Sequence, residues 1–343
     1  MTREMFLSEL KKALHALAPV EQEEAVTYYD ELLDDLMQEE GLTQEAAMAR
    51  MDTVASIAER ILEERPAAAS QTAQTSDVNN LPGIREINAK PLSVNHLTIR
   101  ARNIPIIMRA GGADEIILRY PEDDKTEFDF SLENGVLSLV QRPGDIIDLM
   151  TFRIFYRQPY EIELTVPRDF AAAADVKTGN SAIRIENITF WGALTAGTSN
   201  GNLKAENVTA KDIHLTTSNS SVEASQVTSQ NDVILKSSNG RITATQVGCE
   251  KTLRLTTSNA RIECLKCRAG TFSLSTSNGR ISATLPGKMK DYAIASRTSN
   301  GSNSLPAHSD GGPGHLEAVT SNGSIAVGFE NWASCKMSCP EKK

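Results

Sequence analysis

Hydrophobic and polar positions follow two different periods along this chain of 343 residues. In residues 1–65, apolar side chains recur every three or four positions, as at Phe6, Leu10 and Leu14, which predicts one apolar face on each helix. From about residue 92 onward, apolar and polar residues alternate, which predicts β-strands. The pattern therefore predicts a multidomain chain: a small all-α bundle followed by an all-β region.

Three helical segments are expected within residues 1–65. Pro19 begins the second segment, and Gly41 ends it because glycine takes the left-handed conformation without strain. Thr43 can cap the third segment, which breaks near Asp52 and Thr53. Amphipathic helices bury their apolar faces against one another, so the three segments predict a bundle.

Charge is distributed unevenly between the two regions. Residues 1–65 hold 6 Lys and Arg against 16 Asp and Glu, a net charge of −10, while the whole chain carries −9. Such an acidic surface repels nucleic acid and anionic lipid and suits a basic protein surface. The polar, small-sided stretch that follows predicts a flexible linker, which we place at residues 66–91.

The start of the chain, Met1-Thr2-Arg3-Glu4, lacks the basic segment and apolar run of a signal peptide, and no stretch reaches the roughly 18 apolar residues of a membrane span. We therefore expect a cytoplasmic protein with no membrane span. The cysteines are odd in number and unevenly spaced, which favours reduced thiols over a disulfide framework. They are Cys249, Cys264, Cys267, Cys335 and Cys339.

A repeat of about twenty residues runs through the second region. Its Ser-Asn or Gly-Asn turns place asparagines at intervals of 20, 19, 20, 20, 19, 22 and 22 residues. These are Asn180, Asn200, Asn219, Asn239, Asn259, Asn278, Asn300 and Asn322. In most repeats, apolar residues precede the asparagine by six and four positions and follow it by three, five and eight. Each repeat thus predicts two strands and a corner, and stacked repeats predict a parallel β-solenoid, or β-helix, at residues 92–330 with a tail at 331–343.

Each asparagine is in phase with the inward residues of its rung. Its amide is therefore expected at the edge of the stack, hydrogen-bonded to the amide of the next rung as an asparagine ladder. Glycine often follows, and we expect it to use its freedom at positive φ. These glycines are Gly201, Gly240, Gly279, Gly301 and Gly323. The longer strands of residues 96–166 predict an N-terminal cap, and residues 306–314 predict a loop that bulges from the last rungs.

Two family resemblances add to this interpretation. The segments Phe6-Leu7-Ser8-Glu9-Leu10 and Ser56-Ile57-Ala58-Glu59-Arg60-Ile61-Leu62 resemble the bacterial HTH-associated α-helical signalling domain, which implies a partner of the PadR-like regulator type. The segment Ile162-Glu163-Leu164-Thr165-Val166-Pro167 and the Thr-Ser-Asn-Gly rungs resemble the bacterial β-strand-repeat family called "putative adhesins". That second resemblance covers residues 92–329 and implies contact with an envelope protein or surface adhesion.

The candidate binding face is a column of three arginines, Arg241, Arg261 and Arg280, each two residues after its asparagine. They are expected to point outward on successive rungs about 4.8 Å apart. A guanidinium column can bind an anionic polymer or an acidic partner. The alternative is a solvated column whose charge is offset by Glu223 and Glu263.

Residue types that carry catalysis or bind metals are scattered, so no catalytic, cofactor-binding or metal site is predicted and no cofactor is expected. Asp212 and Asp232 are expected to be turn residues, and Cys264 and Cys267 small core residues rather than zinc ligands. The histidines are His15, His96, His214, His308 and His315.

These patterns predict a non-enzymatic interaction or scaffold protein, whose helical region docks a regulator or another protein partner and whose solenoid presents a binding face. A surface adhesin-like protein and a carbohydrate-active enzyme on a β-helix are the alternatives, the latter by fold analogy. The end rungs could also stack two molecules end to end.

Overall fold

A computed structural model describes residues 2–17, single positions between 19 and 33, and residues 43–63, 83–111, 115–122, 126–142, 161–170 and 172–330. The chain divides into two compact units. The first centres on Met1–Pro82, and the second consists of Gly83–Asp123, Glu127–Arg142 and Tyr160–Lys343.

The first unit contains the helices α1 (Arg3–Ala13), α3 (Gln44–Arg50) and α4 (Val54–Glu63). Thr43 caps α3, because its Oγ1 accepts a hydrogen bond of 3.3 Å from the Ala46 amide. Thr53 Oγ1 likewise accepts from the Ser56 amide at 3.2 Å. The predicted cap at Thr43 and the break near Thr53 are therefore confirmed.

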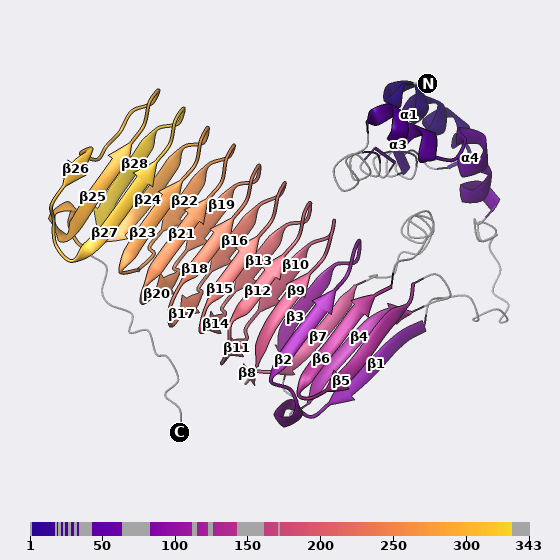
Figure 1. Cartoon of the computed structure of the whole chain (residues 1–343), viewed down its shortest axis with the longest axis horizontal. Coiled ribbons are helices and arrows are strands. Elements are labelled where there is room, and N and C mark those ends of the chain that lie inside the picture. The colour runs from indigo at the N-terminus through magenta and orange to yellow at the C-terminus, as the bar shows by residue number, and fades with distance from the viewer. Residues whose placement is uncertain are drawn as a thin grey trace. The chain divides into compact units, whose positions relative to one another are not determined.

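Figure 1 shows the helices of this unit as ribbons, and their apolar side chains form one buried cluster. It contains Phe6, Leu10, Leu14, Leu17, Ala25, Tyr29, Leu33, Ala47, Ile57, Ala58 and Ile61. The rings of Phe6 and Tyr29 meet edge to face, with centroids 6.2 Å apart. Most of the second expected helical segment, from Pro19 to Gly41, lies outside the described residues, so the bundle as a whole stays a prediction.

Three sheets make up the second unit. The first sheet contains β1 (Gly83–Ala89), β4 (Ile116–Glu122), β7 (Ile162–Pro167), β3 (Ile106–Gly111), β10 (Ile183–Glu186), β13 (Leu203–Glu206), β16 (Val222–Ser225), β19 (Ile242–Thr245), β22 (Ile262–Leu265), β24 (Ile281–Pro286) and β28 (Ile325–Glu330), in that spatial order. The second contains β5 (Phe128–Glu133), β6 (Val136–Gln141), β2 (His96–Arg100), β9 (Ala173–Lys177), β12 (Leu194–Gly197), β15 (Ile213–Thr216), β18 (Val233–Lys236), β21 (Thr252–Thr256), β23 (Thr271–Ser275), β27 (Gly314–Val319), β25 (Tyr292–Arg297) and β26 (His308–Ser309). The third contains β8 (Asp169–Phe170), β11 (Thr189–Phe190), β14 (Thr209–Ala210), β17 (Thr228–Ser229) and β20 (Gly248–Cys249). Two short 3₁₀ helices, η1 (Pro91–Ser93) and η2 (Met289–Asp291), join strands.

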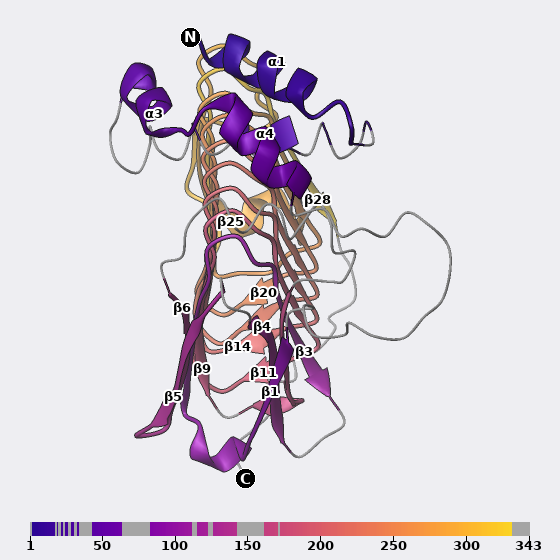
Figure 2. The same ribbon diagram turned by 90° about the vertical axis from the view of Figure 1, so that its right-hand side faces the viewer.

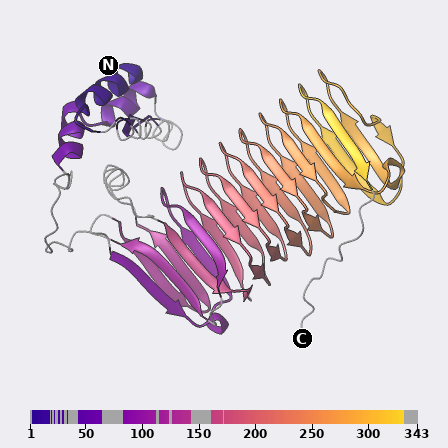
Figure 3. The ribbon, with the colours of Figure 1, turned by 180° about the vertical axis from the view of Figure 1, so that it is seen from behind.

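A typical rung passes through all three sheets. The chain leaves the Ser-Asn turn along the first sheet, crosses the short third sheet, and returns along the second sheet (Figures 2 and 3). Strands of successive rungs pair in parallel; Val222, for example, lies between Leu203 and Ile242. The prediction of a β-solenoid is therefore confirmed. Its third sheet was not expected, because strands of two residues are too short to show a period.

Positive φ angles occur at the corner between the first and third sheets. The residues are Asn187 (φ 60°), Asn207 (φ 52°), Gln226 (φ 54°), Gln246 (φ 55°) and Lys266 (φ 54°). Asn207 Nδ2 also donates a hydrogen bond of 2.8 Å to Asn187 Oδ1 in the neighbouring rung. Side-chain amides at this corner thus help to stabilise a left-handed turn that glycine could otherwise occupy.

The glycines after the ladder asparagines have a role different from the one predicted. Among the described glycines, only Gly135 and Gly287 have positive φ. A Cβ at Gly240 would instead lie 1.6 Å from the carbonyl oxygen of Ser220, and one at Gly279 would lie 1.7 Å from that of Ala260. A Cβ at Gly201, Gly301 or Gly323 would lie 1.8–2.0 Å from a carbonyl oxygen of a neighbouring rung. At these five turns glycine is therefore favoured by close approach between turns and not by its φ angle, whereas Ser220 and Ala260 occupy the same position of other turns.

A column of buried hydroxyl groups stands two residues before the ladder asparagines. Its members are Thr178, Thr198, Thr217, Ser237, Thr257, Thr276 and Thr320, all at most 8% exposed. The Oγ1 of Thr257 lies 3.0 Å from the carbonyl oxygen of Gly240 and 3.3 Å from that of Ser238. At four of the glycines that follow the asparagines, Gly201, Gly240, Gly279 and Gly323, the amide donates to the hydroxyl of its own turn, as Gly240 does to Ser237 at 2.9 Å. Each buried hydroxyl thus satisfies turn carbonyls of the adjacent rung.

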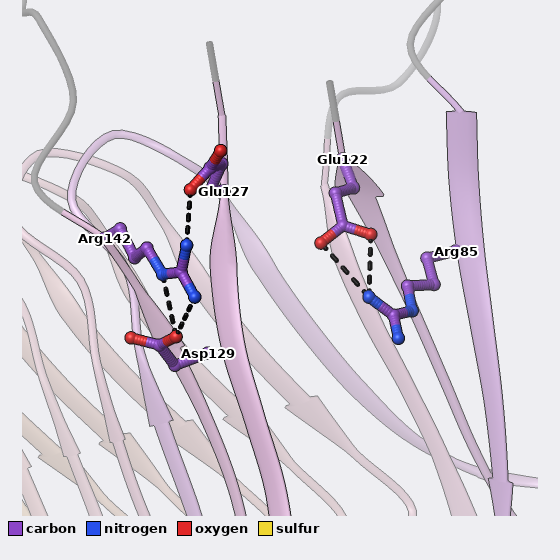
Figure 4. A network of polar contacts seen from close by, with 5 residues as sticks. All are labelled: Arg85, Glu122, Glu127, Asp129 and Arg142. Atoms are coloured by element: carbon purple, nitrogen blue, oxygen red, sulfur yellow. Dashed lines mark hydrogen bonds and ion pairs between the residues drawn. The ribbon is translucent and has the colours of Figure 1, made fainter. Parts of the chain in front are cut away.

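The N-terminal cap combines parallel and antiparallel strands. Strand β1 is antiparallel to β4, β4 to β7, and β5 to β6. The linker predicted at residues 66–91 is therefore too long, because Gly83–Ala89 forms β1. Within Ile84–Ala89, where burial is described, only Ala89 is buried, so the apolar pattern of the strand is weak. Backbone hydrogen bonds to β4 and cross-strand ion pairs stabilise β1 instead. One of these ion pairs is Arg85–Glu122 at 2.9 Å (Figure 4).

The last rungs stack in an order that differs from their order in the chain. Strand β27 lies between β23 and β25, and β28 pairs with β24. The expected loop at residues 306–314 is wrong in part, since β26 pairs antiparallel with β25 along the sheet edge. The intervals of 22 residues before and after Asn300 are longer than the others and supply the chain length for the path out to β25 and back to β27. The expected tail at 331–343 lies outside the described residues.

Close approach of the turns leads to a matched pair of substitutions. Gly240→Ala should lower the free energy of unfolding by about 1–3 kcal/mol, because the new methyl group meets the Ser220 carbonyl. Ala260→Gly, at the same position of the next turn, should cost about 1 kcal/mol or less. Urea unfolding followed by circular dichroism measures both. If the two variants lost equal stability, the steric explanation for glycine would be wrong.

Candidate functional site

The arginine column lies at the start of the first sheet. Arg241, Arg261 and Arg280 are exposed and occupy equivalent positions of three successive rungs. Their register is set by the backbone: the Ile242 amide donates to the Arg261 carbonyl at 3.2 Å, and the Ile262 amide to the Arg280 carbonyl at 2.9 Å. Parallel pairing keeps the arginine Cα atoms about 4.8 Å apart.

Among the described residues, only the middle arginine of the column has an ion-pair partner. Arg261 Nε lies 3.1 Å from Oε1 of Glu263, and the two side chains are 55% and 30% exposed. Within the described residues, no carboxylate lies within ion-pair distance of Arg241 or Arg280. Glu223 stands on the rung before Arg241 and faces Thr243 and Lys204 across the strands. The alternative in which glutamates offset the charge of the column therefore holds for Arg261 alone.

The arginine column has few functional groups suited to catalysis, but it can bind anions. A guanidinium group stays charged throughout the physiological range and presents several N–H donors to carboxylate, sulfate or phosphate oxygens. The rung before the column has Ser221 at the equivalent position, and the rung after it has Ser324. The positive groups are therefore bounded by small neutral side chains on both sides.

The asparagine column stands beside the arginines, two residues earlier in each turn. Each Nδ2 donates to Oδ1 of a neighbouring asparagine at 2.5–2.8 Å. In space the order is Asn103, Asn180, Asn200, Asn219, Asn239, Asn259, Asn278, Asn322 and Asn300. Asn103 was not expected, because it lies 77 residues before Asn180 and outside the repeat.

Most of these asparagine side chains are exposed, and the buried column at the turn is the hydroxyl column. The Thr or Ser two residues before each asparagine recurs as strictly as the asparagine itself, so the sequence did contain this signal. The asparagine ladder therefore forms a regular polar edge that holds the neighbouring arginines in register.

Asp212 and Asp232 lie at the corner that leads into the second sheet. Asp212 Oδ1 accepts from the Asp232 amide at 3.4 Å, and Asp232 Oδ1 accepts from the Thr252 amide at 2.9 Å. Asn231 Nδ2 donates to Asp212 Oδ2 at 3.2 Å. Both carboxylates thus bind the backbone of a neighbouring rung, as expected of turn residues.

The five histidines lie on different elements. His96, His214, His308 and His315 are on β2, β15, β26 and β27, and His15 follows α1. His308 Nε2 lies 3.2 Å from Asp310 Oδ1, with both side chains largely exposed. Among the described residues, no group of three His, Cys, Asp or Glu side chains is placed to hold a metal ion.

Cys249, Cys264 and Cys267 are free thiols buried in the solenoid. Cys264 lies between Ala244 and Ala283 of the adjacent rungs, the core position expected for it. Its hydrogen bond with Cys267 and its burial raise the pKa of the Cys264 thiol, and burial raises the pKa of Cys249 to about 12. Cys249 and Cys264 therefore stay protonated at neutral pH and act as core side chains. Cys335 and Cys339 lie outside the described residues.

Comparison with known proteins places the solenoid in one family. A family model described as Toastrack DUF4097 matches residues 94–327. No curated protein matches the chain. A solved "putative cell adhesion protein" from Clostridium sporogenes ATCC 15579 shares 10% identity over 73% of this chain and 100% of its own, with a TM-score of 0.29. A solved "putative adhesin" from Bacteroides fragilis NCTC 9343 shares 11% over 72% of this chain and 97% of its own, with a TM-score of 0.30.

Proposed function

We propose that this chain, which belongs to the Toastrack family DUF4097, is a non-enzymatic binding protein whose arginine column recognises an anionic partner. The observation that carries the proposal is the stacking of Arg241, Arg261 and Arg280 on successive rungs, with Arg241 and Arg280 outside any ion pair among the described residues. Three cations at a fixed spacing suit a ligand with regularly repeated negative charges, such as an acidic polypeptide or a sulfated polysaccharide.

The scaffold favours such recognition. Ladder hydrogen bonds on both sides of the turn fix the backbone before a ligand arrives, so binding orders only the arginine side chains. The free guanidinium groups are exposed and hydrated, so each contributes little alone and the column acts through their sum.

A charge-matched comparison tests the arginine face. Replacing Arg241, Arg261 and Arg280 by Ala should weaken binding of a fluorescent poly-glutamate peptide or of heparin by roughly tenfold or more, at about 0.5–1 kcal/mol for each charge. The control replaces Lys236, Arg254 and Arg297, three exposed cations of the second sheet, by Ala. Fluorescence anisotropy at low and moderate salt measures both.

The two variants have the same net charge. Equal weakening by both would show that binding reflects overall charge, and unchanged binding by the arginine variant would dismiss the face. Preference for heparin over poly-glutamate would favour the surface adhesin-like alternative. Turnover of a polysaccharide would instead favour the carbohydrate-active enzyme.

The helical unit is proposed as a second docking surface, for a basic protein. Its net charge of −10 over residues 1–65 supports this, and its resemblance to the HTH-associated α-helical signalling domain suggests a regulator of the PadR-like type. None of the described helices is long and apolar enough to cross a membrane. We propose that both surfaces operate in the cytoplasm.

Charge reversal in the full-length protein tests this docking surface. Glu4, Glu9 and Glu45 are exposed, and their replacement by Lys should abolish co-purification of a basic helix-turn-helix regulator from the native bacterium. Replacement of the exposed Glu133, Glu250 and Glu317 of the solenoid by Lys serves as the control. Mass spectrometry identifies the proteins that each variant captures. Retention of the regulator by the variant of the helical unit would contradict the proposal.

A further inference from the structure

The C-terminal end of the asparagine ladder differs chemically from its interior. Five asparagines of the ladder are followed by glycine: Asn200, Asn239, Asn278, Asn300 and Asn322. Asparagine before glycine is chemically labile, because no side chain hinders attack of the next backbone nitrogen on the asparagine amide. The fold protects these five positions to different degrees.

Interior asparagines are held at both side-chain atoms. Asn322 donates from Nδ2 to Asn278 Oδ1 at 2.7 Å and accepts at Oδ1 from Asn300 at 2.7 Å. Asn200, Asn239 and Asn278 are likewise bonded on both sides. Rotation of such a side chain out of the ladder breaks two hydrogen bonds.

The attacking nitrogen is also engaged at the interior positions. The Gly323 amide donates to Thr320 Oγ1 at 3.2 Å. Gly201, Gly240 and Gly279 donate in the same way to the buried hydroxyls of their own turns. The glycine amide must leave this bond before it can attack.

Asn300 stands at the end of the ladder. Within the described ranges, it lacks one of the two side-chain hydrogen bonds of the interior asparagines, and the amide of the glycine that follows it lacks the hydroxyl acceptor. Asn300 donates to Asn322 Oδ1, while its own Oδ1 accepts no hydrogen bond from any residue that the structure describes. The Gly301 amide also has no hydrogen-bond acceptor within the described part of the chain, and the hydroxyl of Thr298 is directed to the Gly323 carbonyl at 2.8 Å. Asn300 is exposed to solvent.

We infer that Asn300 is a site of spontaneous deamidation, selected by its place at the end of the ladder. The Gly301 nitrogen loses its proton to hydroxide and attacks Cγ of Asn300; an N–Cγ bond forms, the Cγ–Nδ2 bond breaks, and Nδ2 takes a proton from water and leaves as ammonia. Water then opens the cyclic imide to aspartate or isoaspartate. Mildly alkaline pH accelerates the reaction, because the attacking amide must be deprotonated.

The product changes the end of the solenoid. An ionised carboxylate at position 300 cannot donate to Asn322 Oδ1, so two acceptors would face each other where one hydrogen bond stood. Isoaspartate also adds a methylene group to the backbone of this turn. Deamidation therefore loosens the turn after β25 and adds one negative charge there.

The sequence provides a matched internal control for the test. Asn300 and Asn322 lie in identical pentapeptides, Thr-Ser-Asn-Gly-Ser, so any difference in their rates comes from the fold. Full-length native protein is incubated in mildly alkaline buffer, and peptide mapping by mass spectrometry quantifies aspartate and isoaspartate at each position. Asn300 should convert roughly tenfold or more faster than Asn322, since two additional hydrogen bonds protect the latter.

In denaturant the two sites should convert at equal rates. Equal rates in the native protein, or earlier conversion at Asn200, Asn239 or Asn278, would overturn the inference. A second variant tests the ladder directly: Asn300→Ala makes Asn322 the terminal member and should raise its rate several-fold, because one of its two protecting side-chain bonds is lost. An unchanged rate at Asn322 would contradict the role of the ladder.

Discussion

The structure of the solenoid depends on hydrogen bonds between the turns of successive rungs. Parallel strands pair along their length, but the Ser-Asn turn exposes carbonyl groups that no strand can satisfy. The buried hydroxyl at the position of Thr257 lies within hydrogen-bond distance of two of these carbonyls in the neighbouring rung, and the exposed asparagine bridges to its counterpart. Because both contacts require one turn to lie directly on the next, they fix the register of every strand that follows.

Register in turn determines what the surface presents. Residues at equivalent positions form columns, so one arginine repeated three times becomes a line of charge at a spacing set by the backbone. The same rule places Cys264 between Ala244 and Ala283 of the adjacent rungs, where its hydrogen bond with Cys267 and its burial raise the pKa of its thiol. It also makes the ladder ends unlike its interior, because Asn300 has one ladder neighbour whereas Asn322 has two.

The sequence predicted the features that show a clear period and missed those that are too short to show one or that depend on contacts between distant segments. Alternating apolar residues around Asn219 or Asn239 identified the strands of two sheets, and the interval of about twenty residues identified the solenoid. The third sheet has two residues per strand, too few to show a period. The insertion of β27 before β25 depends on pairing between distant segments. The glycine positions were identified, but their cause was not, since a clash with the Ser220 carbonyl appears only when rungs are stacked. The arginine column was predicted as a set, whereas the Arg261–Glu263 pair requires side-chain geometry.

The stability of two variants at adjacent positions tests the central role of the turn hydrogen bonds most directly. Thr257 is buried and bonded to turn carbonyls, while Thr256, the last residue of β21, points outward. Valine at either position keeps the shape and removes the hydroxyl. We expect Thr257→Val to lower the free energy of unfolding in urea by about 1–3 kcal/mol and Thr256→Val to change it by less than about 0.5 kcal/mol. Equal stability of the two variants would show that the buried hydroxyl column does not hold the rungs in register.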